Sequence, residues 1–181
     1  MHSRQAFAGA RHPPATRYIA FGVIGLGRLQ RLGMRVNVDR AGYPEPMPDP
    51  PDVFRPLADA GAFADLVGPL HIGPGDVLGV RVEERHLNRA GTAIGGCLAT
   101  LVDAALGRAV RAEADGDASI ATVSLTTDYL RPAPSGAWLE ARTAVERMGG
   151  RLAFADCSVT ADGREAVRAR AVLAVGAGDE D

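Results

Sequence analysis

The sequence predicts an α+β domain in which one long helix lies in a curled, mainly antiparallel five-stranded sheet. Three observations favour this fold class. Residues 96–112 carry apolar side chains at helical spacing, and four strand-like segments follow between residues 119 and 175. Asp162 and Gly163 form a dipeptide typical of a two-residue hairpin. A curled sheet is the economical way to bury the apolar stripe of a single helix.

The predicted elements begin with a short amphipathic helix over residues 54–70. Residues 77–82 alternate with period two, which predicts a half-buried strand. The long helix over 96–112 presents the stripe Leu98, Leu101, Val102, Ala105 and Ala109. The other four strands are expected at residues 119–130, 137–148, 151–160 and 165–175.

The domain is expected to span residues 54–176, after a poorly structured Pro- and Gly-rich leader and linker (1–53) and before an acidic tail (177–181). The segment GVIGLGRLQRLG is not a dinucleotide-binding loop, because Gln30 stands where the third glycine belongs. The apolar run YIAFGVIGLG is too short to span a bilayer, which needs about 20 residues. No signal-peptidase site follows it. Met34 and Met47 remain open as alternative starts.

Composition narrows the function classes. A net charge of −2 gives no general affinity for nucleic acid or for an anionic membrane. Cys97 and Cys157 match neither a metal motif nor a redox pair. We therefore expect a cytoplasmic protein without a metal site.

The start of the long helix is the first candidate functional feature. Gly95 and Gly96 lie where backbone N–H groups have no intrahelical partner and the helix dipole is positive. Glycine also permits close approach to the backbone. Such a terminus can bind an anion, or the oxyanion that forms during acyl transfer. Glycine needed only for the geometry of the turn is the alternative.

Asp103 is the second candidate feature. On the helix it lies in line with Gly96, Thr100 and Gly107, a row of small residues away from the apolar stripe. A second chain can pack closely against such a row. The carboxylate is then expected to be partly desolvated, which makes it a stronger base. A solvated surface aspartate is the alternative.

The spacing of the two features predicts a dimer. Gly95 and Asp103 are eight residues apart, or roughly 12 Å along a helix. One bound carbonyl group cannot readily reach both. If two copies pack antiparallel through the small row, Asp103 of one chain approaches Gly95 of the other. The expected assembly is a two-fold dimer with two composite sites.

The segments HLNRAGTAIGGCLATLVDAALGRA and TVSLTTDYLRPAPSG together resemble the hotdog-fold acyl-CoA thioesterases of the phenylacetate-pathway (PaaI-like) type, in the superfamily of 4-hydroxybenzoyl-CoA thioesterase. The resemblance covers about residues 54–175. It implies that Asn88 and the N–H of Gly95 polarise the thioester carbonyl. It also implies that Asp103 of the facing subunit activates water or attacks directly, and that Thr122 helps to hold Asp103.

By the same resemblance, the reaction hydrolyses an acyl-CoA to free acid and CoA without a cofactor, in a homodimer or a dimer-of-dimers tetramer. Members commonly have His where Ile94 stands, so we expect a weaker or differently selective thioesterase. Ile94 and Gly96 are expected to contact substrate. Arg131, Arg147 and Arg151 cluster near strand ends, and Arg131 is the candidate for contact with the CoA phosphates. Solvated surface arginines are the alternative.

Other functions fit the sequence less well. A non-catalytic hotdog module that binds acyl-CoA as a sensor would need a DNA-binding helix-turn-helix, and the leader supplies no convincing one. A hotdog dehydratase would need His paired with the acid, and none accompanies Asp103 in the motif. Cys97 is expected to be a small buried residue and His86 to cap a strand end. Ser124 and Asp128 are expected on the polar side of the strand that also carries Thr122, as peripheral residues.

Overall fold

The computed structural model describes residues 49–58, 60–114 and 118–176, all within the unit Met47–Asp181. Most of the predicted leader, the segment GVIGLGRLQRLG and the acidic tail lie outside the described residues.

The five predicted strands are β3 (Leu78–Arg81), β4 (Ser119–Tyr129), β5 (Trp138–Met148), β6 (Leu152–Ala161) and β7 (Arg164–Gly176). Two strands of two residues each, β1 (Arg55–Pro56) and β2 (His71–Ile72), extend the sheet beyond β3. The described sheet therefore has seven strands, in the order β1-β2-β3-β5-β6-β7-β4, and every pairing is antiparallel. The prediction of five missed β1 and β2 because two residues are too few to show an alternating pattern.

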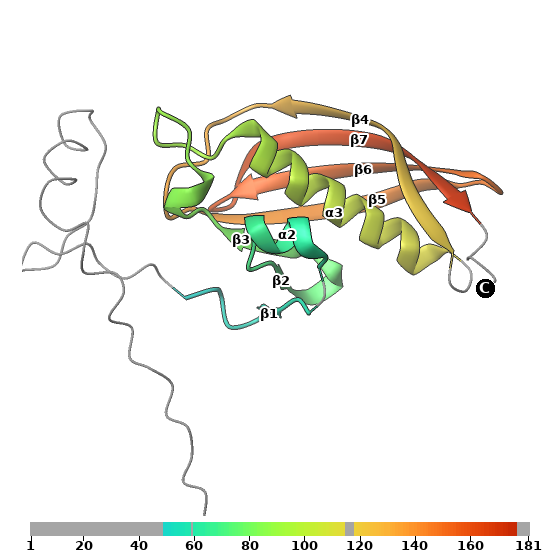
Figure 1. The fold of residues 1–181 in the computed structure, drawn as a ribbon, viewed down its shortest axis with the longest axis horizontal. Coiled ribbons are helices and arrows are strands. Elements are labelled where there is room, and N and C mark those ends of the chain that lie inside the picture. The colour runs from blue at the N-terminus through green and yellow to red at the C-terminus, as the bar shows by residue number, and fades with distance from the viewer. Residues whose placement is uncertain (1–48, 59, 115–117, 177–181) are drawn as a thin grey trace, which may run out of the picture. The chain divides into compact units, whose positions relative to one another are not determined.

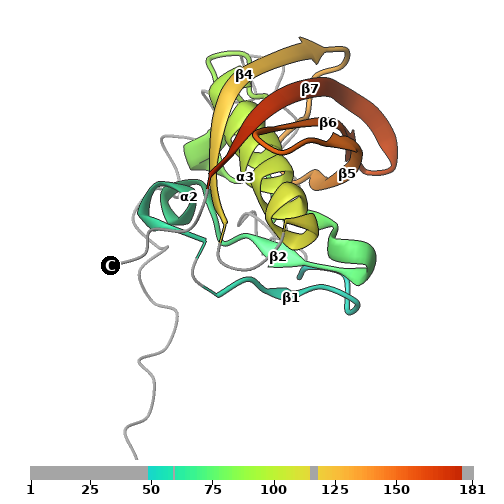
Figure 2. The ribbon, with the colours of Figure 1, turned by 90° about the vertical axis from the view of Figure 1, so that its right-hand side faces the viewer.

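The long helix α3 (Gly95–Glu113) lies across one face of the sheet, which curls around it (Figures 1 and 2). Its bounds differ from the prediction by one residue at each end. The row of small residues lies away from the core: Gly96 and Asp103 are exposed, and Thr100 and Gly107 are half-buried. Of the predicted stripe, Ala109 is only half-buried, whereas Leu98, Leu101, Val102 and Ala105 are buried. The other buried residues of α3 are Cys97, Leu106 and Val110.

The predicted helix over residues 54–70 is wrong in extent. The observed α2 covers only Ala62–Val67. Pro56 lies in β1, Gly61 has a φ of 90°, and Gly68–Pro69 ends the segment, so the backbone cannot continue as one helix. Ala64 is the one buried residue of α2, which leaves this helix a minor part of the core.

Strand β3 is buried on both faces, although its alternation predicted a half-buried strand. Gly79 lies beneath Trp138 and Phe54, whose rings pack edge to face with centroids 5.0 Å apart. The Arg81 guanidinium lies 5.0 Å from the centroid of the Trp138 ring, and its Nη2 donates to the carbonyl of Asp49. Residues distant in sequence thus cover the face that the local pattern assigned to solvent.

Gly79→Ala is expected to lower the free energy of unfolding by about 1–3 kcal/mol, the cost of overpacking a filled core. A Cβ at this position would lie 2.3 Å from Cζ2 of Trp138. Urea denaturation followed by the fluorescence of Trp138, the single tryptophan of the chain, measures the change. Gly150→Ala is the control, because a Cβ there would meet no atom within 4 Å. Equal midpoints for Gly79→Ala and the wild type would contradict the packing described.

A β-bulge in the edge strand β4 sets the direction of Thr122. The pairing with β7 shifts between Thr122 and Ser124, so that Thr122 is opposite Leu173 and Ser124 is opposite Val172. Adjacent residues of β7 face opposite sides of the sheet. Thr122 therefore faces α3, whereas Ser124 and Asp128 face away from it, on the polar side of the strand where they are expected. The bulge adds one residue and reverses the alternation.

Candidate active site

The backbone at the start of α3 presents two free donors. The N–H groups of Gly95 and Gly96 have no acceptor within the part of the chain that the structure describes. Ile94 is the N-cap residue: its N–H donates to the carbonyl of His86 (2.8 Å), and its carbonyl accepts from Cys97 (3.0 Å). The Ile94 side chain is 52% exposed beside these donors. It does not cap the helix.

Tyr129, the last residue of β4, holds the start of α3. Its hydroxyl donates to the carbonyl of Gly95 at 3.0 Å. A Cβ at Gly95 would lie 3.2 Å from Cζ of the Tyr129 ring, so the ring lies against the glycine. Sequence reasoning missed this residue, because no local pattern relates a tyrosine at a strand end to a glycine 34 positions earlier.

Thr122 and Asp103 are brought together in the structure. The Thr122 hydroxyl donates to Oδ1 of Asp103 at 2.7 Å. Oδ2 of Asp103 has no partner among the described residues and is free to accept a further hydrogen bond. Asp103 is exposed within the single chain. A single chain therefore does not provide the predicted desolvation of the Asp103 carboxylate.

The two contacts lie at different positions along β4, the edge strand. Tyr129 near its end contacts Gly95, and Thr122 near its start contacts Asp103. The exposed side chains of β4 include Val123 (61%) and Tyr129 (51%). An exposed edge strand of this length is open to pairing with another strand.

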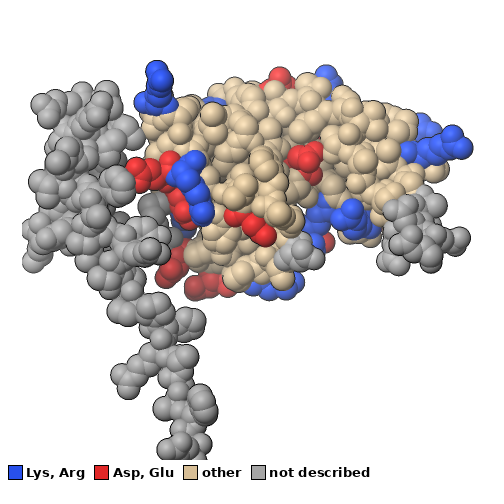
Figure 3. Space-filling view, in the orientation of Figure 1, with Lys and Arg blue, Asp and Glu red and all other residues tan. Residues whose placement is uncertain are grey.

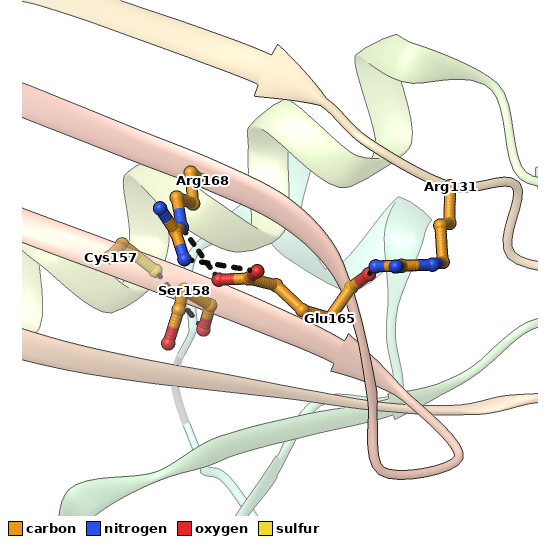
Figure 4. A network of polar contacts seen from close by, with 5 residues as sticks. All are labelled: Arg131, Cys157, Ser158, Glu165 and Arg168. Atoms are coloured by element: carbon orange, nitrogen blue, oxygen red, sulfur yellow. Dashed lines mark hydrogen bonds and ion pairs between the residues drawn. The ribbon is translucent and has the colours of Figure 1, made fainter.

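A pocket of about 310 Å³ opens at the start of α3. Arg131 at its rim donates from Nη1 to the carbonyl of Glu165 at 2.8 Å, while the Glu165 carboxylate binds Arg168 (Figure 4). Arg131 forms no ion pair with any described residue, so its charge remains available. A larger hollow of about 540 Å³, which includes Asp128, contains none of the predicted site residues. The pocket at α3 is lined by Ala93, Gly95, Leu98, Tyr129, Leu130, Arg131 and Pro132.

The predicted cluster of Arg131 with Arg147 and Arg151 does not form. Arg131 follows the end of β4, where β7 begins, whereas Arg147 and Arg151 flank the turn from β5 to β6. That turn is at the other end of the sheet, because β6 begins opposite the last residues of β7. In an antiparallel sheet, successive strands end at opposite ends of the sheet. The sequence alone does not show which strand ends lie together.

Asn88 shapes the loop that leads into α3. Its Oδ1 accepts from the N–H groups of Ala90 (2.8 Å) and Thr92 (3.3 Å), and its Nδ2 donates to the Thr92 hydroxyl (3.0 Å). The side chain is exposed. Since an amide NH₂ carries two hydrogens, one donor remains for a substrate.

The surroundings of His86 and Cys97 indicate structural rather than catalytic roles. Nδ1 of His86 accepts from the N–H of Glu83 (2.9 Å), and Nε2 lies 2.7 Å from the carbonyl of Val67, which fits a neutral ring protonated at Nε2. Burial lowers the pKa of His86. Burial also raises the pKa of the Cys97 thiol, which disfavours a thiolate nucleophile. Cys97 is buried, as predicted, whereas His86 lies in the 3-10 helix Glu84–His86 and caps the start of that helix rather than a strand end.

Among the described residues, no group of three His, Cys, Asp or Glu side chains could hold a metal ion. No described helix is both long enough and apolar enough to cross a membrane.

A family model described as "Thioesterase superfamily" matches residues 90–167. "Putative esterase PA0474" of Pseudomonas aeruginosa is 38% identical over 109 residues, which are 58% of this chain and 81% of that protein. A variant of the phenylacetic acid degradation protein PaaI of Thermus thermophilus is 29% identical, with 62% of this chain and 96% of that chain covered and a TM-score of 0.55. A hypothetical thioesterase of Streptococcus pneumoniae, solved with coenzyme A, has a similar fold (24% identity, 56% and 78% covered, TM-score 0.53). The chain therefore belongs to the thioesterase superfamily and has the hotdog fold.

Proposed function

We propose that the protein hydrolyses an acyl-CoA thioester to the free acid and CoA, at a site shared by two subunits. The observation that carries this proposal is the pair of contacts along β4: Tyr129 with Gly95, and Thr122 with Asp103. An oxyanion-binding backbone and a carboxylate base are each fixed to the same edge strand, at separate positions. These are the two groups that thioester hydrolysis needs.

In the proposed mechanism, Oδ2 of Asp103 accepts a proton from a water molecule, and the water oxygen attacks the thioester carbonyl carbon. Thr122 orients the carboxylate through its bond to Oδ1. The N–H of Gly95 and the remaining amide donor of Asn88 stabilise the oxyanion. When the tetrahedral intermediate collapses, the C–S bond breaks, and the CoA thiolate takes a proton from Asp103. No cofactor takes part in this scheme.

The two halves of the site are proposed to come from different subunits. Gly95 and Asp103 are roughly 12 Å apart along α3, so one thioester does not reach both within a chain. Antiparallel pairing of β4 with β4 of a second copy would bring the Thr122 end of one strand toward the Tyr129 end of the other. The second copy would also cover Asp103 and supply the desolvation that the single chain lacks.

The surface supports this mode of assembly. In the view of Figure 3, few charged side chains lie over β4 and the adjoining part of α3, although one acidic patch lies near the middle of the view and acidic and basic patches lie below it. An unpaired edge strand beside a surface with few charges fits a homodimer interface. A tetramer made of two such dimers is compatible with it.

Coenzyme A is proposed to enter by the pocket at the start of α3. Arg131 carries an unpaired positive charge at its rim and would meet a phosphate group. Gly96 and the exposed Ile94 would contact the atoms next to the thioester. The CoA in the structure of the Streptococcus pneumoniae relative supports this class of substrate. The proposed catalytic domain spans residues 54–176, in a cytoplasmic protein.

A thiol-release assay over short, medium, long and aryl acyl-CoAs tests the proposed function. We expect CoA release from at least one class. We also expect Ile94→His to raise that rate, as the family resemblance implies, and an unchanged rate would make position 94 incidental. Binding of acyl-CoA without release from any class would instead identify a non-catalytic acyl-CoA-binding module.

A further inference from the structure

We propose that Tyr129 is a positioning residue for the oxyanion site and that it makes the N–H of Gly96 a second oxyanion donor. This inference rests on the proposed function and extends it to the N–H of Gly96 and to the hydroxyl of Tyr129. It starts from the hydrogen bond between the Tyr129 hydroxyl and the carbonyl of Gly95, at 3.0 Å.

The bonded carbonyl belongs to the peptide group that carries the N–H of Gly96. A peptide group is planar, so fixing its C=O also fixes the direction of its N–H. A hydrogen bond to the carbonyl further polarises the amide and strengthens the N–H as a donor, by about 10–30% per bond. Tyr129 thus acts on Gly96 through one rigid group.

The surroundings of Gly96 leave this donor accessible. Gly96 is exposed, its N–H has no described acceptor, and a Cβ there would meet no atom within 4 Å. The contrast with Gly95 is informative, because at Gly95 the Tyr129 ring fills the space that a side chain would need. Tyr129 therefore closes one side of the helix terminus and leaves the N–H groups of both glycines without a described acceptor.

The hydroxyl of Tyr129 has a location that supports a role in the reaction. Tyr129 lines the pocket at the start of α3 together with Gly95. The side chain is 51% exposed, so it contributes little to the core. Removing its hydroxyl should therefore affect the oxyanion more than the stability of the fold.

Tyr129→Phe tests the inference, because it removes the hydroxyl and keeps the ring. We expect kcat to fall about tenfold, less than the roughly 100- to 1,000-fold loss typical of removing a donor itself, with KM changed by less than about twofold. Thr126→Val is the matched control: it removes a hydroxyl from the same strand, opposite Arg170 and away from α3, and should keep the kcat of the wild type.

Two CoA analogues separate positioning from a general structural effect. A trifluoromethyl ketone analogue, which forms an oxyanion at the site, should bind Tyr129→Phe about tenfold more weakly than it binds the wild type. An S-alkyl CoA thioether, which lacks the carbonyl oxygen next to the sulfur, should bind both proteins equally. Equal weakening of the two analogues, or an unchanged kcat in Tyr129→Phe, would overturn the inference and leave the thioesterase function intact. A wild-type protein that releases no CoA would overturn the proposed function and this role with it.

Discussion

Asp103→Asn is expected to lower kcat about 1,000-fold, within the range of roughly 100- to 10,000-fold typical of general base catalysis. Asparagine has nearly the same shape and keeps an oxygen that can accept from Thr122, so the 2.7 Å contact can persist. It cannot accept a proton from water. The loss should therefore appear in kcat rather than in KM, measured by CoA release with the best acyl-CoA substrate.

Asp128→Asn is the control for this variant. Asp128 is an exposed aspartate on the same edge strand, on the face turned away from α3. Its substitution removes the same charge and should leave kcat near that of the wild type. If Asp103→Asn keeps its activity, the protein is still a thioesterase, but Asp103 is not its base.

Gly95→Pro is expected to lower kcat/KM about 100- to 1,000-fold, the usual cost of losing one oxyanion donor. Gly95 is the first residue of α3, where proline is well tolerated and no intrahelical hydrogen bond is lost. Ile94 before it has φ −67° and ψ 144°, an extended conformation that suits a residue preceding proline. The substitution therefore removes the N–H and preserves the helix.

Gly95→Ala provides the comparison for the proline variant. Alanine adds the same Cβ against the Tyr129 ring, 3.2 Å from Cζ, but keeps the N–H. If the donor matters, the alanine variant should lose much less activity than the proline variant. Equal losses would show that crowding of Tyr129, rather than the missing N–H, is responsible.

The sequence predicted the elements whose patterns are long. Helix α3 and the strands β4 to β7 each repeat their pattern over ten or more residues, and α3 was located to within one residue at each end. The short strands β1 and β2 were missed, and Pro56 and Gly61 interrupt the helix predicted over 54–70. The burial of Gly79 depends on Phe54 and Trp138, which reach it only through the tertiary fold.

For the candidate site, the sequence motif identified most of the residues but not which of them contact one another. Thr122 contacts Asp103 only because a bulge reverses the alternation of β4, and an extra residue in a strand leaves no clear mark in the sequence. Tyr129 was missed because its partner Gly95 lies in another element, far away in the sequence. Separation of Arg131 from Arg147 likewise follows from strand order, which is a property of the whole sheet.

The central claim, a site shared by two subunits, is tested most directly by mixing two inactive variants. Asp103→Asn and Gly95→Pro chains, with different affinity tags, are unfolded together, refolded, and assayed for CoA release. Random pairing makes half of the dimers mixed, and each mixed dimer has one intact site of two, so the account predicts about a quarter of wild-type activity. Activity no higher than that of either variant refolded alone would contradict it, because a site built within one chain would stay defective in every pairing.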